Sequence, residues 1–193
     1  MSFFAEIDLC QVIDISPYYI WSRIFFDLHN IFVGMQDTEG NIQIGISMPE
    51  YDKYHLKLGN KLRLHSKLSS KLEIIDLPTV LKKYMEYISL SPIRQVPKNI
   101  KGYAIYKRIQ KKGNYLKLAR RKAKRTSMSV EEAISCYDKY RETQLKMPYI
   151  KIKSSSTGQD FSLFINKILT DQANDLWTFN IYGLSDGSTV PEF

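Results

Sequence analysis

Hydrophobic and polar residues alternate at the start of the chain, in AEIDLCQVID at 5–14, as they do in a half-buried strand. Ser16 and Pro17 then supply a helix cap and a proline suited to a first helical turn. From Ile20 to Phe32 the apolar residues recur every three or four positions. This spacing predicts an amphipathic helix that ends near Gly34.

The rest of the first half alternates again between strand-like and helix-like patterns. The expected elements are strands over 42–48 and 61–66, a helix over 69–87 that is interrupted at Pro78, and a strand over 88–96. The last strand contains Pro92, which favours a sheet edge because proline cannot donate a backbone hydrogen bond. The order strand, helix, strand, strand, helix, strand is that of the ferredoxin-like (RRM-like) βαββαβ arrangement. We therefore predict an α+β protein with a ferredoxin-like domain over residues 1–97.

Residues 98–193 are predicted to form a smaller α+β domain. The expected elements are a strand in GYAIYKRIQ at 102–110, a helix over 115–125, a helix from Ser129 to about Gln144, and strands in YIKIKSSSTGQDFSLFINKIL at 149–169 and in WTFNIYGL at 177–184. Ser129 and Glu132 have the spacing of a capping box, in which each residue hydrogen-bonds the backbone of the other.

The composition excludes several classes of protein. Of the 193 residues, 44% are hydrophobic and 25% are charged, which fits a packed domain and not a disordered chain. No apolar run is long enough to span a membrane, and the first residues do not have the pattern of a secretory signal. Cys10 and Cys136 cannot build a disulfide framework, and neither has a partner at metal-ligand spacing. We expect a cytoplasmic protein without a structural metal.

The positive charge is confined to one segment. The formal net charge is +8, yet residues 1–97 and 126–193 are both slightly acidic. Residues 98–125 hold twelve Lys or Arg and no Asp or Glu. Such a block is typical of proteins that bind a polyanion, either nucleic acid or an anionic membrane, although a solvated basic face without a partner has the same composition. A membrane is disfavoured because the opposite face of the expected basic helix has few apolar residues.

The basic residues of the expected helix at 115–125 are arranged on one side. Lys117, Arg121 and Lys124 share a face, with Arg120 and Arg125 beside it. This face is suited to phosphates, while the other side is free to pack.

Only three histidines are candidates for acid–base chemistry. His55 lies in a polar loop, and His65 ends an expected strand, where a structural role fits it. His29 lies at the edge of the apolar stripe of the first helix, where spacing alone favours a boundary residue. Its chemistry still makes it a candidate, because histidine titrates near neutral pH.

The segment SSSTGQ at 154–159 is the densest group of hydroxyl side chains in the chain. Its composition is typical of a loop, and its hydroxyls, Ser156 among them, also suit contacts to phosphate or ribose. It lacks the spacing of a nucleotide-binding P-loop. KGYAIY at 101–106 matches half of an RNA-recognition strand, but Lys107 and Arg108 replace the valine and the aromatic that complete that motif.

Several segments together resemble the repeat-processing endoribonuclease of type I-F CRISPR systems. They are FFDLHNIFVG at 25–34, IGISMPEYD at 44–52, LGNKLRLHS at 58–66, YKRIQ at 106–110, the basic helix, SSSTGQDFSLFI at 154–165 and YGLSDGSTVPEF at 182–193. They follow the family's order and cover nearly the whole chain.

The resemblance implies an enzyme that needs no metal or cofactor. In this family a ribose 2′-hydroxyl attacks the neighbouring phosphate and leaves a 2′,3′-cyclic phosphate and a 5′-hydroxyl. His29 matches the catalytic histidine, Ser154 the serine that holds the ribose, and Tyr182 the tyrosine that orients the histidine.

The resemblance also implies how the RNA is bound. Arg108 and Gln110 match the pair that reads the base pairs beside the cut, and Phe161 matches an aromatic that stacks on the end of the stem. Arg120, Arg121, Lys124 and Arg125 fall where the family's arginine-rich helix meets the hairpin. The implied partners are CRISPR repeat hairpin RNA, as precursor and as mature guide, and the other subunits of the type I-F interference complex.

The chain departs from the family pattern at Lys122, Lys124, Thr126 and Asp160 and in a longer loop at 35–41, which affects the repeat sequence it would prefer. Two alternatives remain from the sequence alone. One is a hairpin-binding subunit that does not cleave, and the other is a general RNA-binding protein with an RRM-like fold.

Overall fold

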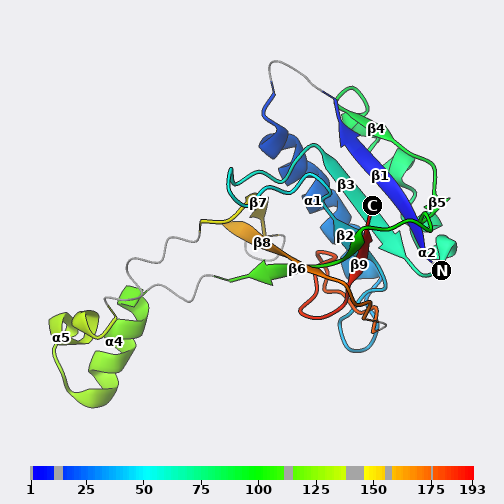
Figure 1. The fold of residues 1–193 in the computed structure, drawn as a ribbon. Helices are drawn as coiled ribbons and strands as arrows, with labels where there is room; N and C mark the ends of the chain where they lie inside the picture. Colours follow the sequence, from blue (N-terminus) through cyan, green and yellow to red (C-terminus); the bar gives the residue numbers. More distant parts are fainter. Residues whose placement is uncertain (1, 11–14, 111–114, 138–145, 155–157, 175) are drawn as a thin grey trace. The chain divides into compact units, whose positions relative to one another are not determined.

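The chain forms two compact units in a computed structural model (Figure 1). The structure describes residues 2–10, 15–110, 115–137, 146–154, 158–174 and 176–193. The large unit consists of Met1–Arg108 with Met147–Phe193, and the small unit of Ile109–Lys146. The division at residue 97 separates a ferredoxin-like domain from a domain expected to bind RNA, and it stays a prediction beside these two compact units.

An antiparallel sheet and one long helix form the first part of the large unit. The strands are β1 (Phe3–Leu9), β2 (Gly45–Ser47), β3 (Lys61–Ser66), β4 (Ile88–Leu90) and β5 (Arg94–Gln95). Their order is β2-β3-β1-β4, and β5 also pairs with β1. The helix α1 (Pro17–Gly34) has the bounds predicted from its apolar spacing. Its buried stripe, which includes Ile24 and Phe32, belongs to one core with apolar residues of the sheet such as Leu64.

The helix predicted over 69–87 is broken into shorter pieces. They are α2 (Ser69–Glu73), α3 (Leu77–Val80) and the 3₁₀ turn η1 (Lys82–Tyr84). The break precedes the predicted position, because Asp76 takes a left-handed backbone conformation with φ of 46°. Pro78 lies in the first turn of α3, where a helix tolerates its missing N–H.

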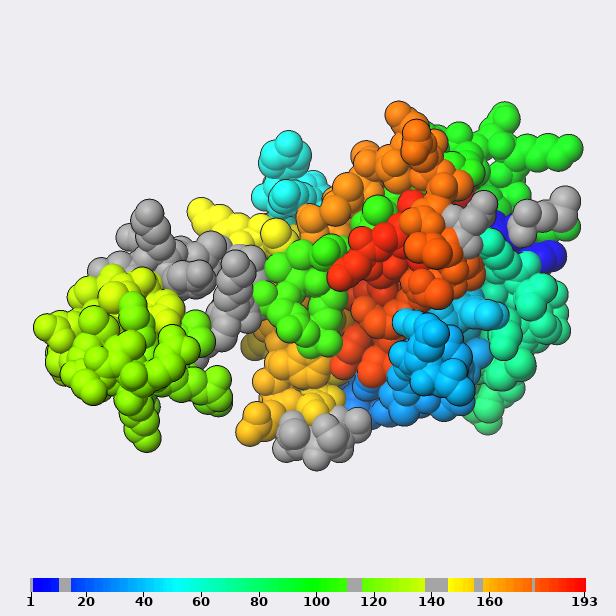
Figure 2. Space-filling view, turned by 90° about the horizontal axis from the view of Figure 1, so that it is seen from below, coloured from blue at the N-terminus to red at the C-terminus, as the bar shows by residue number. Residues whose placement is uncertain are grey.

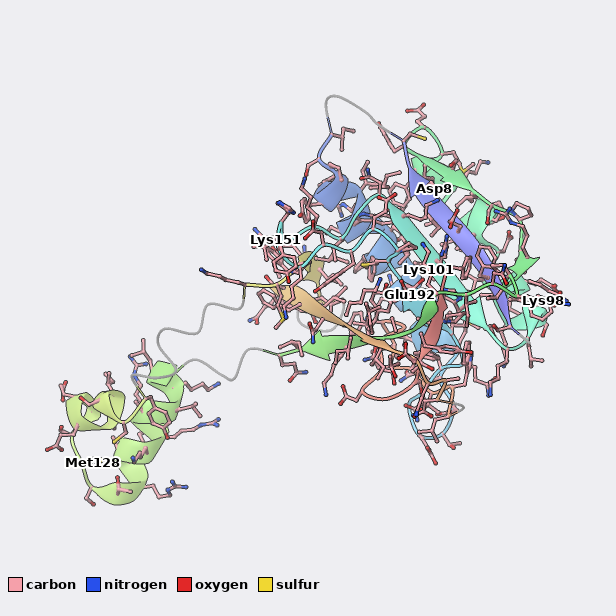
Figure 3. All side chains as sticks on the ribbon, viewed as in Figure 1. Asp8, Lys98, Lys101, Met128, Lys151 and Glu192 are labelled. Atoms are coloured by element: carbon pink, nitrogen blue, oxygen red, sulfur yellow. The ribbon has the colours of Figure 1, made fainter. Side chains whose placement is uncertain are left out.

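A second antiparallel sheet completes the large unit. Its strands are β6 (Gly102–Ile109), β7 (Tyr149–Lys153), β8 (Asp160–Thr170) and β9 (Val190–Glu192), in the order β7-β8-β6-β9. Glu192 on β9, labelled in Figure 3, interacts with side chains of both β6 and β8. The Tyr106 hydroxyl on β6 lies 2.8 Å from its Oε1, and Lys167 Nζ on β8 lies 2.6 Å from its Oε2.

In this half of the chain one predicted strand is absent and one observed strand was not predicted. WTFNIYGL at 177–184 is no strand: Phe179 forms an isolated bridge with Ile42, and the following residues form a turn. The strand β9 was not predicted, because three residues containing a proline show no periodicity. Together the two sheets and the helices confirm the α+β class.

Two strands of the first sheet have bounds that differ from the predicted ones. The first strand begins at Phe3 and ends at Leu9, and residues 11–14 of the expected strand lie outside the described residues. The strand predicted over 88–96 is divided into β4 and β5, with Pro92 between them.

The small unit is a pair of helices. In it, α4 (Tyr115–Thr126) packs against α5 (Val130–Ser135) through Ala119, Ala123 and Ala133. The predicted capping box is present, since Ser129 and Glu132 each accept a hydrogen bond from the other's backbone N–H. α5 ends at Ser135, before the predicted end, and residues 138–145 lie outside the described residues.

His65 is buried in β3 without exposed surface, as a structural histidine would be. Its Nε2 lies 2.8 Å from the Ser47 hydroxyl, and its Nδ1 has no hydrogen-bond partner among the described residues. Burial, aided by the charge of Arg63 and opposed by that of Glu6, lowers the pKa of His65 from 6.5 to about 3.

This histidine is expected to make folding sensitive to mild acid. The unfolded chain takes up the proton near pH 6.5 and the folded chain only near pH 3, so the free energy of unfolding falls as the pH decreases between these values. The expected contribution is about 1.4 kcal/mol per pH unit. Urea denaturation at several pH values measures this slope. His65→Gln keeps a polar group near Ser47 without titrating, and its curve should be shallower; parallel curves would contradict the prediction.

Candidate active site

His29 lies near the end of α1 and is 7% exposed. Its ring stacks on that of Tyr182, with centroids 4.4 Å apart and planes at 5°. His29 Nδ1 lies 3.0 Å from the carbonyl oxygen of Ile181. A carbonyl can only accept, so Nδ1 is the nitrogen that carries the proton in this hydrogen bond. The other ring nitrogen, Nε2, is therefore left for proton transfer.

The turn at 180–184 presents both of these groups to His29. Gly183 N–H donates to the carbonyl of Asn180 at 2.8 Å, and Ile46 N–H on the neighbouring segment donates to the carbonyl of Gly183 at 2.9 Å. Gly183 has φ of +70°, and a Cβ there would lie 2.5 Å from Cγ2 of the buried Ile46. The turn therefore requires glycine, both for its backbone conformation and for its close approach to the sheet.

Arg108 and Phe161 also lie beside Tyr182. The Phe161 ring meets the Tyr182 ring edge-on, with centroids 6.3 Å apart, and the Arg108 guanidinium carbon lies 5.5 Å from the Phe161 centroid and 5.2 Å from that of Tyr182. In the space-filling view of Figure 2, the red C-terminal residues lie beside green residues with the colour of β6, in agreement with the pairing of β6 with β9. Four of the residues singled out in the sequence thus form one cluster: His29, Arg108, Phe161 and Tyr182.

The Tyr182 hydroxyl stays protonated near neutral pH. Burial raises its pKa above the usual 10, and the positive charge of Arg108 only partly opposes this. Tyr182 therefore contacts His29 through its aromatic ring, while its hydroxyl remains a neutral phenol.

Ser154 follows directly after β7, a strand that packs against α1. Its backbone N–H donates to the carbonyl of Gln159, and its carbonyl accepts from Gly158 N–H, both at 2.9 Å. The position of its side chain as a ribose contact remains a prediction. Ser156 lies outside the described residues.

The predicted basic face is present on α4 in the small unit. Five exposed side chains make up this face, which we call the cationic face: Lys117, Arg120, Arg121, Lys124 and Arg125. Ala119 and Ala123 are buried on the opposite side, against α5. Lys122 lies between the two sides, with Nζ 5.8 Å from the ring centroid of Tyr137. Gln110, exposed after the end of β6, also belongs to the small unit.

The remaining histidines lie elsewhere, as the sequence analysis expected. His55 is exposed and its Nδ1 lies 2.6 Å from an Asp52 carboxylate oxygen. Within the described ranges, no three His, Cys, Asp or Glu side chains come together as metal ligands would. No helix of the described part of the chain has the length and hydrophobicity to span a membrane.

The sequence is similar to known proteins along its whole length. Residues 4–193 match the family model described as CRISPR-associated protein (Cas_Csy4). Two proteins named CRISPR-associated endonuclease Cas6/Csy4 are each 30% identical to this chain, with 100% of both chains covered. One, from Escherichia coli (strain UTI89 / UPEC), aligns over 195 residues, and the other, from Pseudomonas aeruginosa (strain UCBPP-PA14), over 193.

Proposed function

We propose that this chain, which belongs to the Cas_Csy4 family of CRISPR-associated proteins, is an endoribonuclease that cuts CRISPR repeat RNA at the 3′ base of its hairpin. The names of its relatives support a CRISPR-associated endonuclease. The observation that carries the proposal is the position of His29, which is held through Nδ1 by the Ile181 carbonyl and covered on one face by Tyr182. A histidine held in this way has one defined nitrogen for moving a proton.

The proposed reaction uses a nucleophile that the RNA itself supplies. The ribose 2′-oxygen next to the scissile phosphate forms a bond to phosphorus, and the bond from phosphorus to the 5′-oxygen breaks. The products are a 2′,3′-cyclic phosphate and a 5′-hydroxyl, so one proton leaves the 2′-oxygen and one reaches the 5′-oxygen. His29 Nε2 serves one of these transfers, and Ser154 holds the ribose. No metal or cofactor takes part in this scheme.

The neighbours of His29 supply groups for binding the end of the stem. Arg108 offers a guanidinium for a guanine edge, and Phe161 offers an aromatic face for stacking on a base pair. Arg108 lies beside the rings of both Phe161 and Tyr182, so base recognition and the proposed cut occur at one place. Gln110 is proposed to read the adjacent base pair.

The cationic face of α4 is proposed to bind the phosphates of the hairpin. Each phosphate contact releases counterions from the RNA, so the complex would be tight and sensitive to salt. We also propose that the enzyme keeps the mature guide RNA and stays with it as a subunit of the type I-F interference complex. The strand order β2-β3-β1-β4 supports the ferredoxin-like assignment of residues 1–97, which belongs to the same proposal.

The decisive test of the proposed reaction is a cleavage assay on repeat hairpin RNA in EDTA. A matched substrate carries one 2′-deoxy sugar just upstream of the expected cut. We expect the all-ribose RNA to be cut at the 3′ base of the stem and the deoxy RNA to bind equally well and remain intact. Tight binding without cleavage of either RNA would make the protein a hairpin-binding subunit. Equal affinity for a DNA hairpin of the same sequence would indicate a general nucleic-acid-binding protein.

Substitutions of Tyr182 are expected to show that the cleavage rate depends on its ring and not on its hydroxyl. Tyr182→Phe keeps the stack on His29 and should cleave at nearly the wild-type rate. Tyr182→Ala removes a stacked aromatic pair, which is worth about 1 kcal/mol, and should lower the single-turnover rate by about five- to tenfold. Rates measured with enzyme in excess over RNA test this prediction. A loss in Tyr182→Phe as large as that in Tyr182→Ala would assign the effect to the hydroxyl instead.

A further inference from the structure

We propose that Asn180 is a positioning residue for His29, a role that rests on the proposed function. The hydrogen bonds that the side chain of Asn180 makes within the described residues go to the backbone of the turn, not to the imidazole. Asn180 acts through the turn at 180–184, whose Ile181 carbonyl and Tyr182 ring are the two groups that hold His29. The side chain of Asn180 thereby determines which ring nitrogen of His29 carries the proton.

The side-chain oxygen of Asn180 closes this turn from within. Asn180 Oδ1 accepts hydrogen bonds from the backbone N–H of Tyr182 at 2.9 Å and of Leu184 at 3.3 Å. The backbone N–H of Asn180 donates to the carbonyl of Leu184 at 2.8 Å. Asn180 therefore connects the two ends of the turn. It also holds the backbone N–H of Tyr182, which lies in the chain between the Ile181 carbonyl and the Tyr182 ring.

The position of the Ile181 carbonyl depends on these bonds. Ile181 lies between Asn180 and Tyr182, and the peptide that carries its carbonyl also carries the Tyr182 N–H that Asn180 Oδ1 accepts. A peptide unit is planar, with C=O and N–H pointing in opposite directions. Fixing the N–H toward Asn180 therefore aims the carbonyl away from Asn180, toward His29 Nδ1.

The consequence for the reaction is a defined tautomer. While the Ile181 carbonyl accepts from Nδ1–H, the neutral imidazole keeps its lone pair on Nε2. When the peptide is free to rotate, this hydrogen bond is lost, and the proton distributes between the two nitrogens. Part of the protein then carries the proton on Nε2, so the nitrogen proposed to serve the proton transfer no longer has one defined state.

The test compares Asn180→Ala and Asn180→Asp with the wild type. We expect Asn180→Ala to lower the single-turnover cleavage rate by about tenfold, which corresponds to the loss of about one hydrogen bond, with hairpin affinity within about threefold of the wild type. Asn180→Asp keeps an oxygen that accepts the same two N–H groups and should restore most of the rate. Long-range ¹H–¹⁵N spectra of the RNA-free protein, at a pH where the ring is neutral, should show Nδ1–H for His29 in the wild type and a mixture in Asn180→Ala. The spectrum of His29→Ala identifies the His29 signals.

Asn174→Ala is the matched control. Asn174 Oδ1 accepts the backbone N–H of Leu176 at 3.0 Å in the same C-terminal segment, and among the described residues no hydrogen bond joins its side chain to His29 or to the turn. Equal losses of rate in the two alanine variants, or an unchanged His29 tautomer in Asn180→Ala, would overturn the positioning role. If the wild type does not cleave, the proposed function fails, and the spectra still decide whether Asn180 sets the tautomer.

Discussion

Replacing His29 by alanine is expected to lower the single-turnover rate of hairpin cleavage by about 10²–10⁴-fold, the usual contribution of a positioned general acid or base. Hairpin affinity should stay within about threefold, because the proposed binding groups, Arg108, Phe161 and the cationic face, remain in place. The rate is measured with enzyme in excess, and affinity is measured on the 2′-deoxy hairpin so that cleavage does not disturb it.

His55→Ala is the control for this prediction. His55 is exposed and interacts with Asp52, outside the cluster around Tyr182, so its replacement should leave cleavage and binding unchanged. A His29→Ala protein that cleaves at the wild-type rate would show that another group moves the protons. A proportional loss of binding and cleavage would instead assign His29 a binding role.

Removing three charges from the cationic face is expected to weaken hairpin binding about 100-fold. The variant carries Arg120→Gln, Arg121→Gln and Lys124→Gln; at about 1 kcal/mol for each exposed phosphate contact, three contacts account for this factor. The slope of log affinity against log salt should become shallower by about 2 to 3, because fewer counterions are released on binding. Filter binding at several salt concentrations measures both quantities. Glutamine is close to arginine and lysine in helix propensity, so α4 should remain folded.

The control removes the same charge from the large unit. Lys53→Gln, Lys57→Gln and Lys82→Gln change three exposed lysines outside α4 and outside the basic block at 98–125. This variant has the same net charge as the α4 variant and should lose much less affinity. Equal effects in the two variants would indicate that the overall charge, and not the cationic face, determines binding.

Local patterns predicted the elements whose stability depends on neighbouring residues in the chain. The helix α1 begins at Pro17 and ends at Gly34, because a proline suited to the first turn and a regular apolar stripe both lie within it. The capping box at Ser129 and Glu132 and the two sides of α4 were predicted for the same reason. Each of these features involves residues within about one helical turn.

The errors occurred where distant contacts or unusual backbone conformations decide the structure. The helix over 69–87 breaks at Asp76, whose left-handed conformation has no periodic signal. The strand β9 has three residues and exists because it pairs with β6, more than 80 residues earlier in the chain. WTFNIYGL has strand-like composition, yet Gly183 permits a turn that approaches the sheet more closely than a residue with a Cβ could.

The sequence by itself determined the family and the basic helix with its exposed face, and it singled out the histidine on α1 as the candidate for proton transfer. These conclusions depend on residue types and short spacings. The tertiary structure decided how that histidine is held. The Ile181 carbonyl that fixes Nδ1 is a backbone group 152 residues from His29, and every residue has such a carbonyl. Asn180 is equally ordinary in the sequence, as one asparagine near a glycine. Only the folded chain brings one particular carbonyl to the ring, since its direction depends on the turn and on the packing of that turn against the sheet.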